Sequence, residues 1–177
     1  MDNIILKYLR GDWDKPPEDI IKKLPEHINT KIQKTIAKNQ QKLWGWKVPS
    51  SCITLHYYLP YVQNPYIIVC ERSKEKIINS LMERDKMSKE SAELLYNKYK
   101  AFLEKFIHNY TGKIMYVSYA KLMKQPDTQL EKITHFIGIS SQNKDAAKTM
   151  IIPKKELEKQ KQLLKKKEIL NIIKDVM

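Results

Sequence analysis

The stretch from Pro65 to Arg84 shows the clearest change of hydrophobic pattern along the chain. It begins with an apolar and aromatic run, PYIIVC, and passes through the charge pair Glu71 and Arg72 into a segment with helical spacing. A continuous apolar run of this length is typical of a strand buried on both faces, in a parallel sheet covered by helices. Ligands of such sheets bind outside the carboxyl ends of the strands. The pattern therefore predicts a ligand-facing turn at Arg72.

Apolar residues at helical spacing predict two helices near the start of the chain. One covers residues 3–9 and ends at Gly11, and a longer one covers about 25–41. The inward positions of the longer helix are Ile28, Ile32 and Ile36. Between the two, Pro16 and Pro17 precede an acidic turn, a pattern that favours the start of a further helix.

A short aromatic segment, LWGWK at 43–47, predicts a second strand that ends before Pro49. Ser50 or Ser51 can then cap a helix that stops at Pro60. This helix carries Cys52, Ile53, Leu55, His56 and Leu59. The order of strand, helix and strand predicts a βαβ crossover that leads into the apolar run.

The second half of the chain is predicted to be mainly helical. Three- and four-residue spacing indicates a helix after Arg72, a long helix over 88–110, and a helix from an Asp127 N-cap to Gly138. A third strand is expected at 113–117. The aromatic stripe of the long helix is assigned to the core rather than to a cofactor site.

These elements predict an α/β fold, a three-layer sandwich with a short, mainly parallel sheet flanked by helices. The 177 residues suffice for one sizeable core, so we expect a single domain over 1–177. A lysine-rich helix at about 153–177 is expected to end it, with its charges on a solvated face.

The chain is strongly basic, with 33 Lys and Arg against 20 Asp and Glu and a net charge of +13. Such a charge favours acidic partners in general: phosphorylated cofactors, nucleic acid or anionic membranes. The basic residues are spread through the sequence without interleaved aromatic platforms, which disfavours a nucleic-acid-binding protein. A solvated basic surface is the simpler interpretation.

Cys52 and Cys70 are expected to be buried, reduced thiols, since nothing in the pattern favours a disulfide. The histidines are not spaced with Cys or carboxylates as metal ligands are, so no metal site is predicted. The sequence shows no signal-peptide pattern and no apolar stretch of about 20 residues, and a cytoplasmic protein is expected.

Four segments, in order, resemble the sulfotransferase family that uses 3′-phosphoadenosine 5′-phosphosulfate (PAPS). They are GDWDKPP, WGWKVP, YIIVCERSKEKIINSL and MYVSYAKLMKQPDTQLEKITHFIGI, and they cover most of 11–139. The second is similar to the family's WGWKDP segment, the third to its strand, Arg loop and helix, and the fourth to its later strand, YEDL-like turn and helix. The resemblance implies a P-loop NTPase-like fold.

The resemblance also implies roles for three residues. Arg72 and Ser80 match the Arg and Ser that bind the 3′-phosphate of the nucleotide, and Lys47 matches the lysine near the transferred sulfuryl group. A guanidinium suits phosphate because it makes bidentate, charge-assisted hydrogen bonds. Family members with a catalytic histidine carry it just after that lysine. His56 does not fit that spacing and is expected to be a packed helix residue.

This sequence departs from the family pattern in the part that holds the 5′-phosphosulfate. It has no loop of the PKSGTTW or RSGTS kind, and its four glycines are isolated, so no cradle of successive N–H groups can be assigned. Val48 and Ser50 replace the Asp and Arg of WGWKDPR, and Ala120 replaces the YED acid. Without the family's first strand a sheet edge is left open, to be covered by a partner, another copy or an upstream segment.

The expected function is therefore sulfuryl transfer from PAPS to a hydroxyl or amine acceptor, without a metal. Two alternatives stay open. The chain can be a non-catalytic nucleotide-binding or assembly module of the same fold, or a basic nucleic-acid-binding protein.

Overall fold

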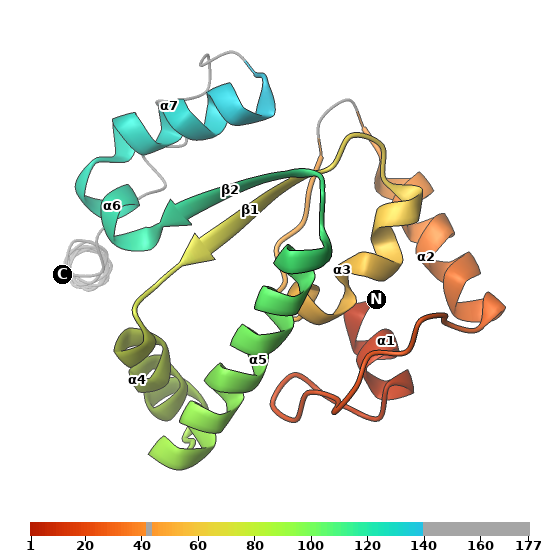
Figure 1. Cartoon of the computed structure of the whole chain (residues 1–177), viewed down its shortest axis with the longest axis horizontal. Coiled ribbons are helices and arrows are strands. Elements are labelled where there is room, and N and C mark those ends of the chain that lie inside the picture. The colour runs from red at the N-terminus through yellow and green to blue at the C-terminus, as the bar shows by residue number, and fades with distance from the viewer. Residues whose placement is uncertain (42–43, 140–177) are drawn as a thin grey trace, which may run out of the picture. The chain divides into compact units, whose positions relative to one another are not determined.

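The computed structural model describes residues 1–41 and 44–139, in which seven α-helices and a two-stranded sheet form an α/β fold (Figure 1). The elements in order are α1 (Asp2–Tyr8), α2 (Glu26–Asn39), α3 (Ser51–Tyr58), the 3₁₀ turn η1 (Leu59–Tyr61), β1 (Tyr66–Glu71), α4 (Lys74–Asp85), α5 (Lys89–Asn109), β2 (Lys113–Ser118), α6 (Tyr119–Lys124) and α7 (Pro126–Ile137). The predicted α/β class is confirmed. The predicted lysine-rich helix at about 153–177 lies outside the described residues.

The chain divides into two compact units. The first consists of Met1–Ile67 and Ser73–Lys113, and the second of Ile68–Arg72 and Ile114–Met177. That both belong to one domain stays a prediction. No helix in the described part of the chain combines the length and the apolar composition needed to cross a membrane.

The first unit is built around α3, which packs against α1, α2 and α5. Its core holds Ile5, Leu6, Leu9, Leu24, Ile28, Ile32, Ile36, Ile53, Tyr57, Tyr58 and Phe102. The predicted isoleucine stripe of α2 is fully contained in that set, because residues four apart lie on one face of a helix. The predicted positions of α1, α2, α3, α4 and α5 are confirmed within a few residues.

The predicted helix after Pro17 is wrong, because residues 18–24 form a loop. Pro17 is fully buried, and the Tyr57 hydroxyl donates a hydrogen bond of 2.7 Å to the Ile21 carbonyl. In the segment before this loop, the Tyr99 hydroxyl donates a hydrogen bond of 2.8 Å to the Trp13 carbonyl. In addition, Pro25 disfavours helical geometry at the residue before it, so little room remains for a helix. Side-chain contacts to the backbone thus fix this loop.

The predicted strand at 43–47 is also wrong for its described residues, 44–47, which form no strand. Trp44 and Trp46 stack at 5.4 Å between ring centroids, and Trp46 packs against Tyr58 at 5.5 Å. The aromatic side chains of this segment therefore pack against one another and the first unit rather than joining a sheet. The predicted βαβ crossover is absent from the described residues, although its helix and its second strand are present as α3 and β1.

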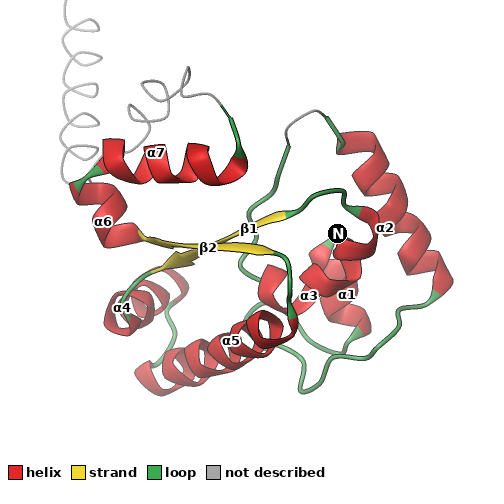
Figure 2. Ribbon diagram, turned by 45° about the horizontal axis from the view of Figure 1, so that its top comes forward, coloured by secondary structure: helices red, strands yellow, loops and turns green. Residues whose placement is uncertain are grey.

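β1 and β2 pair side by side and run in the same direction, so the sheet is parallel (Figure 2). The prediction that β1 is buried on both faces is wrong. Val69 and Val117 are buried, whereas Ile68 and Tyr116 are 37% and 49% exposed. This alternation is typical of a sheet with one covered face.

In the second unit, α6 and α7 pack against each other. α7 ends at Gly138, whose φ of 69° is the left-handed conformation that glycine adopts without strain, as predicted. At the other end the N-cap is Gln125 and not Asp127. Pro126 takes the first helical position, where its missing N–H is not needed.

The two cysteines form no disulfide, and only one of them is partly buried from solvent. Cys52 is partly buried, and burial raises the pKa of its thiol to about 12. Cys70 is exposed, so the expectation that it is buried is wrong. It lies on the face of β1 that bears the exposed Ile68.

At pH 8 we expect iodoacetamide to alkylate Cys70 and to leave Cys52 largely unmodified. A thiol with a pKa of about 12 is thiolate in only ~10⁻⁴ of molecules at that pH, and the thiolate is the nucleophile. Mass spectrometry after timed quenching, with Cys70→Ser as the control, measures the two rates. Alkylation of both cysteines at equal rates would contradict the described burial.

Candidate functional site

Arg72 follows the last residue of β1, at the carboxyl end of the strand, as predicted. Its side chain is exposed. The guanidinium carbon lies 5.5 Å from the centroid of the Tyr119 ring, a cation–π contact within the second unit. A cation at this edge of a parallel sheet lies where α/β folds bind their ligands.

The guanidinium of Arg72 takes part in none of the salt bridges found among the described residues. Those salt bridges join Arg84 to Asp85, Lys98 to Glu18 and Lys100 to Glu104. Glu71 and Glu75, the acidic residues nearest to Arg72 in the sequence, form none of these salt bridges. The chain holds three arginines among its 33 basic residues, Arg10, Arg72 and Arg84. With respect to the described residues, Arg72 therefore has its hydrogen-bond donors available for an anion.

Ser80 and Lys47 belong to the first unit, so the structure describes them separately from Arg72. Ser80 lies on α4 and is half-buried. Lys47 is exposed in the segment before α3, next to the packed Trp46. The two residues come from different elements of the same unit, and the joint action of all three stays a prediction.

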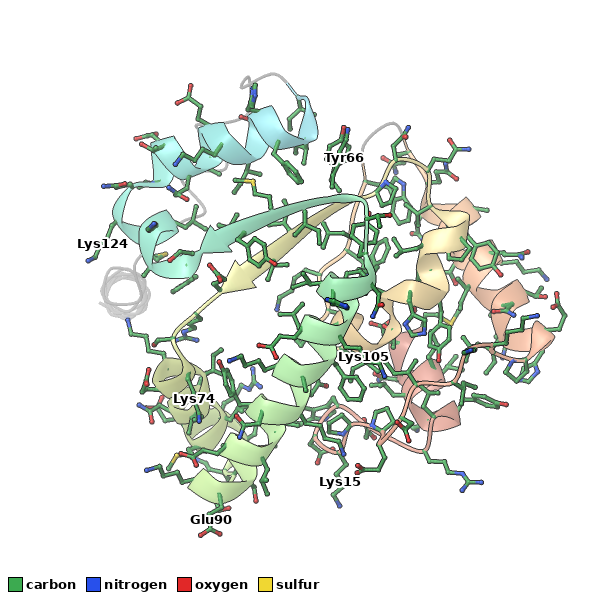
Figure 3. The ribbon with its side chains drawn as sticks, in the orientation of Figure 1. Lys15, Tyr66, Lys74, Glu90, Lys105 and Lys124 are labelled. Atoms are coloured by element: carbon green, nitrogen blue, oxygen red, sulfur yellow. The ribbon has the colours of Figure 1, made fainter. Side chains whose placement is uncertain are left out.

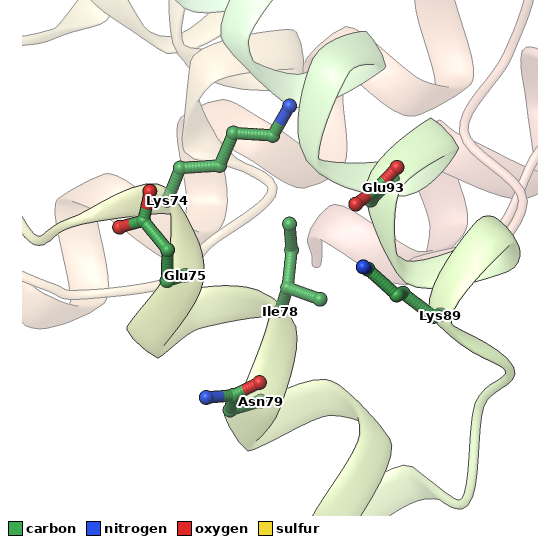
Figure 4. Close-up of a pocket in the computed structure, with 6 residues that line it drawn as sticks. All are labelled: Lys74, Glu75, Ile78, Asn79, Lys89 and Glu93. Atoms are coloured by element: carbon green, nitrogen blue, oxygen red, sulfur yellow. The ribbon is translucent and has the colours of Figure 1, made fainter.

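A groove of about 430 Å³ opens between α4 and α5 in the first unit (Figure 4). Its lining side chains are Lys74, Glu75, Ile78, Asn79, Lys89 and Glu93. Two cations and two carboxylates balance one another there, so the groove has no preference for an anion. Neither Ser80 nor Lys47 is among the lining residues. Lys74 instead lies over the Tyr96 ring, 5.7 Å from its centroid.

Basic side chains are distributed over several elements, with Lys74 on α4, Lys105 on α5 and Lys124 on α6 (Figure 3). This matches the dispersed charge seen in the sequence. Lys113, the first residue of β2, donates a hydrogen bond of 2.9 Å to the hydroxyl of Tyr66, the first residue of β1, and lies over its ring. Each of these lysines belongs to a different helix or strand.

His56 packs within the first unit, against the ring of Tyr57. Burial lowers the pKa of its imidazole, which keeps the ring neutral at neutral pH. Its Nε2 atom and the Ser51 hydroxyl are buried without a hydrogen-bond partner in the described structure. Among the described residues, no three His, Cys, Asp or Glu side chains gather as metal ligands would.

Tyr119 is the residue at this site that the sequence analysis did not single out. It follows β2 directly, as Arg72 follows β1. Because parallel strands end at the same edge of a sheet, the residues after the two strands are natural neighbours. The signal that could have found Tyr119 is therefore its place after the KIMYVS run.

A family model described as the sulfotransferase domain matches residues 56–175, more than half of the chain. The matched part includes Arg72, Ser80 and Tyr119 but not Lys47. No curated protein and no solved structure matches the chain. The match agrees with the α/β class and the short parallel sheet flanked by helices. The chain therefore belongs to the sulfotransferase domain family.

Proposed function

We propose that this protein binds PAPS, or its product adenosine 3′,5′-bisphosphate, with Arg72 as the main contact of the 3′-phosphate. The observation that carries the proposal is the exposed guanidinium at the carboxyl end of β1, which joins no salt bridge within the described residues. A guanidinium has five N–H donors in a planar fork that matches phosphate oxygens. Arg72 thus fits the group that the family uses.

Ser80 and Lys47 enter the proposal through the resemblance. The Ser80 hydroxyl would add a neutral donor to the 3′-phosphate. PAPS supplies an activated sulfuryl group, which passes to a hydroxyl or amine acceptor as its S–O bond to the 5′-phosphate breaks. Lys47 would stabilise the negative charge that builds on the bridging oxygen. The two unpaired cysteines support a cytoplasmic setting for this chemistry.

A second candidate function is a non-catalytic nucleotide-binding or assembly module. Two observations favour it. None of the four glycines neighbours another, so no backbone cradle for the 5′-phosphosulfate is assigned. The sheet of the described residues has two strands, and an unpaired outer edge can accept a strand from a partner or a second copy. Binding of PAPS without release of adenosine 3′,5′-bisphosphate, across a panel of hydroxyl and amine acceptors, would support this candidate over catalysis.

Replacing Arg72 by alanine is expected to weaken the binding of adenosine 3′,5′-bisphosphate about 10- to 100-fold, as loss of charge-assisted hydrogen bonds typically does. Isothermal titration calorimetry at constant ionic strength measures the change. Adenosine 5′-phosphate, which lacks the 3′-phosphate, should bind the native protein and Arg72→Ala with equal affinity.

Arg84→Ala is the matched control, since it removes an exposed arginine that is paired with Asp85. Its affinity for the bisphosphate should equal that of the native protein. If the native protein does not bind the nucleotide, the cofactor proposal is wrong. If Arg72→Ala binds as tightly as the native protein, only the role of Arg72 is wrong.

A further inference from the structure

The ends of the two paired strands bring a cation and an aromatic ring together. Arg72 comes directly after β1 and Tyr119 directly after β2, and the guanidinium carbon lies 5.5 Å from the ring centroid. We propose that Tyr119 is a positioning residue, whose ring holds the guanidinium of Arg72 at the carboxyl end of the sheet, ready for an anion. The anion itself, the 3′-phosphate of a nucleotide, rests on the proposed function.

Tyr119 belongs to a helix, whereas Arg72 lies in a loop. Tyr119 begins α6, and the hydroxyl of Ser118 caps that helix by accepting a hydrogen bond from the Lys121 amide at 3.4 Å. α6 in turn packs against α7. Arg72 lies in the loop between β1 and α4, on a long side chain with much rotamer freedom to lose. Of the pair, Tyr119 is thus the residue whose backbone belongs to a helix.

A contact with a ring restrains a guanidinium without using its hydrogen-bond donors. The attraction comes from the negative face of the ring and the positive charge, so all five N–H groups stay available to a phosphate. Arg84 shows the contrast within this chain. Its Nε and Nη2 atoms donate to the Asp85 carboxylate at 2.9 and 2.7 Å, so these donors are already used. The ring therefore restrains the Arg72 guanidinium without using its hydrogen-bond donors, whereas the guanidinium of Arg84 is restrained through donors that already bond Asp85.

The first test needs no ligand. Because the chain holds three arginines, the ¹⁵N spectrum of the Arg Nε–H groups has three signals to assign, with Arg10→Lys and Arg84→Lys as references. We expect the order parameter of the Arg72 Nε–H group to fall in Tyr119→Leu and to keep its native value in Tyr119→Phe. Tyr116→Leu, which removes another half-exposed tyrosine of the same segment, should leave it unchanged. An unchanged order parameter in Tyr119→Leu would overturn the proposal.

The second test measures affinity for adenosine 3′,5′-bisphosphate. Tyr119→Leu should bind roughly two- to fivefold more weakly, the size of an exposed cation–π contact, and Tyr119→Phe should bind as the native protein does. In an Arg72→Ala background, Tyr119→Leu should cause no further loss. A further loss there would show that the tyrosine acts on the nucleotide itself, which would overturn the positioning role. If the native protein binds no nucleotide, the proposed function fails, and the order parameter alone decides the role of Tyr119.

Discussion

Replacing Asp2 by alanine is expected to lower the free energy of unfolding by about 3 kcal/mol, a loss of about 6–12 °C in Tm for a chain of this size. The Asp2 carboxylate is 7% exposed and accepts hydrogen bonds from the Ser50 hydroxyl, at 3.1 Å, and from the Tyr58 hydroxyl. It thus joins the start of α1 to both ends of α3. Without it, two buried hydroxyls lose their partner, and each unsatisfied group costs about 1–3 kcal/mol.

Burial, and then the hydrogen bond to Asp2, raise the pKa of the Tyr58 phenol above its usual value. The phenol therefore stays protonated and continues to donate to the carboxylate throughout the neutral range. The contact is accordingly expected to stabilise the protein at every pH used for binding measurements.

Two further variants separate the loss of this contact from the loss of any acidic side chain near the N-terminus. Asp19→Ala, in an exposed loop position, should change the free energy of unfolding by less than about 0.5 kcal/mol. The triple variant Asp2→Ala, Ser50→Ala, Tyr58→Phe removes the orphaned hydroxyls and should be more stable than Asp2→Ala alone. Thermal unfolding followed by circular dichroism measures all of them. A triple variant less stable than the single variant would show that packing, not hydrogen bonding, dominates.

The helices could be predicted from the sequence because their apolar faces repeat at helical spacing. The stripe Ile28, Ile32 and Ile36 is wholly buried, as expected. The loop at 18–24 could not be predicted, since the hydroxyl that bonds its backbone, that of Tyr57, comes from α3. The helix propensity of the residues after Pro17 depends only on neighbours in the sequence, so it does not account for contacts from distant parts of the chain.

The prediction of a strand at 43–47 was wrong for a related reason. Aromatic residues two apart fit a strand, but they fit equally well a chain that stacks its rings on a neighbouring helix, as Trp46 does on Tyr58. Only pairing with another strand separates the two outcomes, and pairing is a property of the whole fold.

At the candidate site, the sequence predicted the position of Arg72 because an apolar run followed by a charge marks a strand end. It did not predict Tyr119, whose place depends on the parallel pairing of β1 with β2. Each residue belongs to a recognisable strand end, and their contact follows from the sheet. A site of this kind is therefore recognised from the ends of two paired strands, and not from one segment of the sequence.

The largest effect of a single apolar substitution is expected at Ile53, in the first turn of α3. Its side chain has no exposed surface, and α3 packs against α1, α2 and α5. Ile53→Ala should therefore lower the free energy of unfolding by about 2–5 kcal/mol, through lost burial and the cavity left behind. Ile53→Val, which removes one methyl group, should cost about 0.5–1.5 kcal/mol. Urea unfolding measures both.

Leu94 provides the matched control, since it is a large aliphatic residue on α5 that is 71% exposed. Leu94→Ala should change stability by less than about 0.5 kcal/mol, because its side chain is largely in water in both states. Equal losses in Ile53→Ala and Leu94→Ala would contradict the central place of α3. A different result is that Ile53→Ala is destabilised, Leu94→Ala is not, and the order parameter of the Arg72 Nε–H group keeps its native value in Ile53→Ala. In that case the core of the first unit and the restraint of the Arg72 guanidinium are energetically independent. That result would support the interpretation that changes of nucleotide affinity in the Arg72 and Tyr119 variants come from the site and not from altered stability of the core.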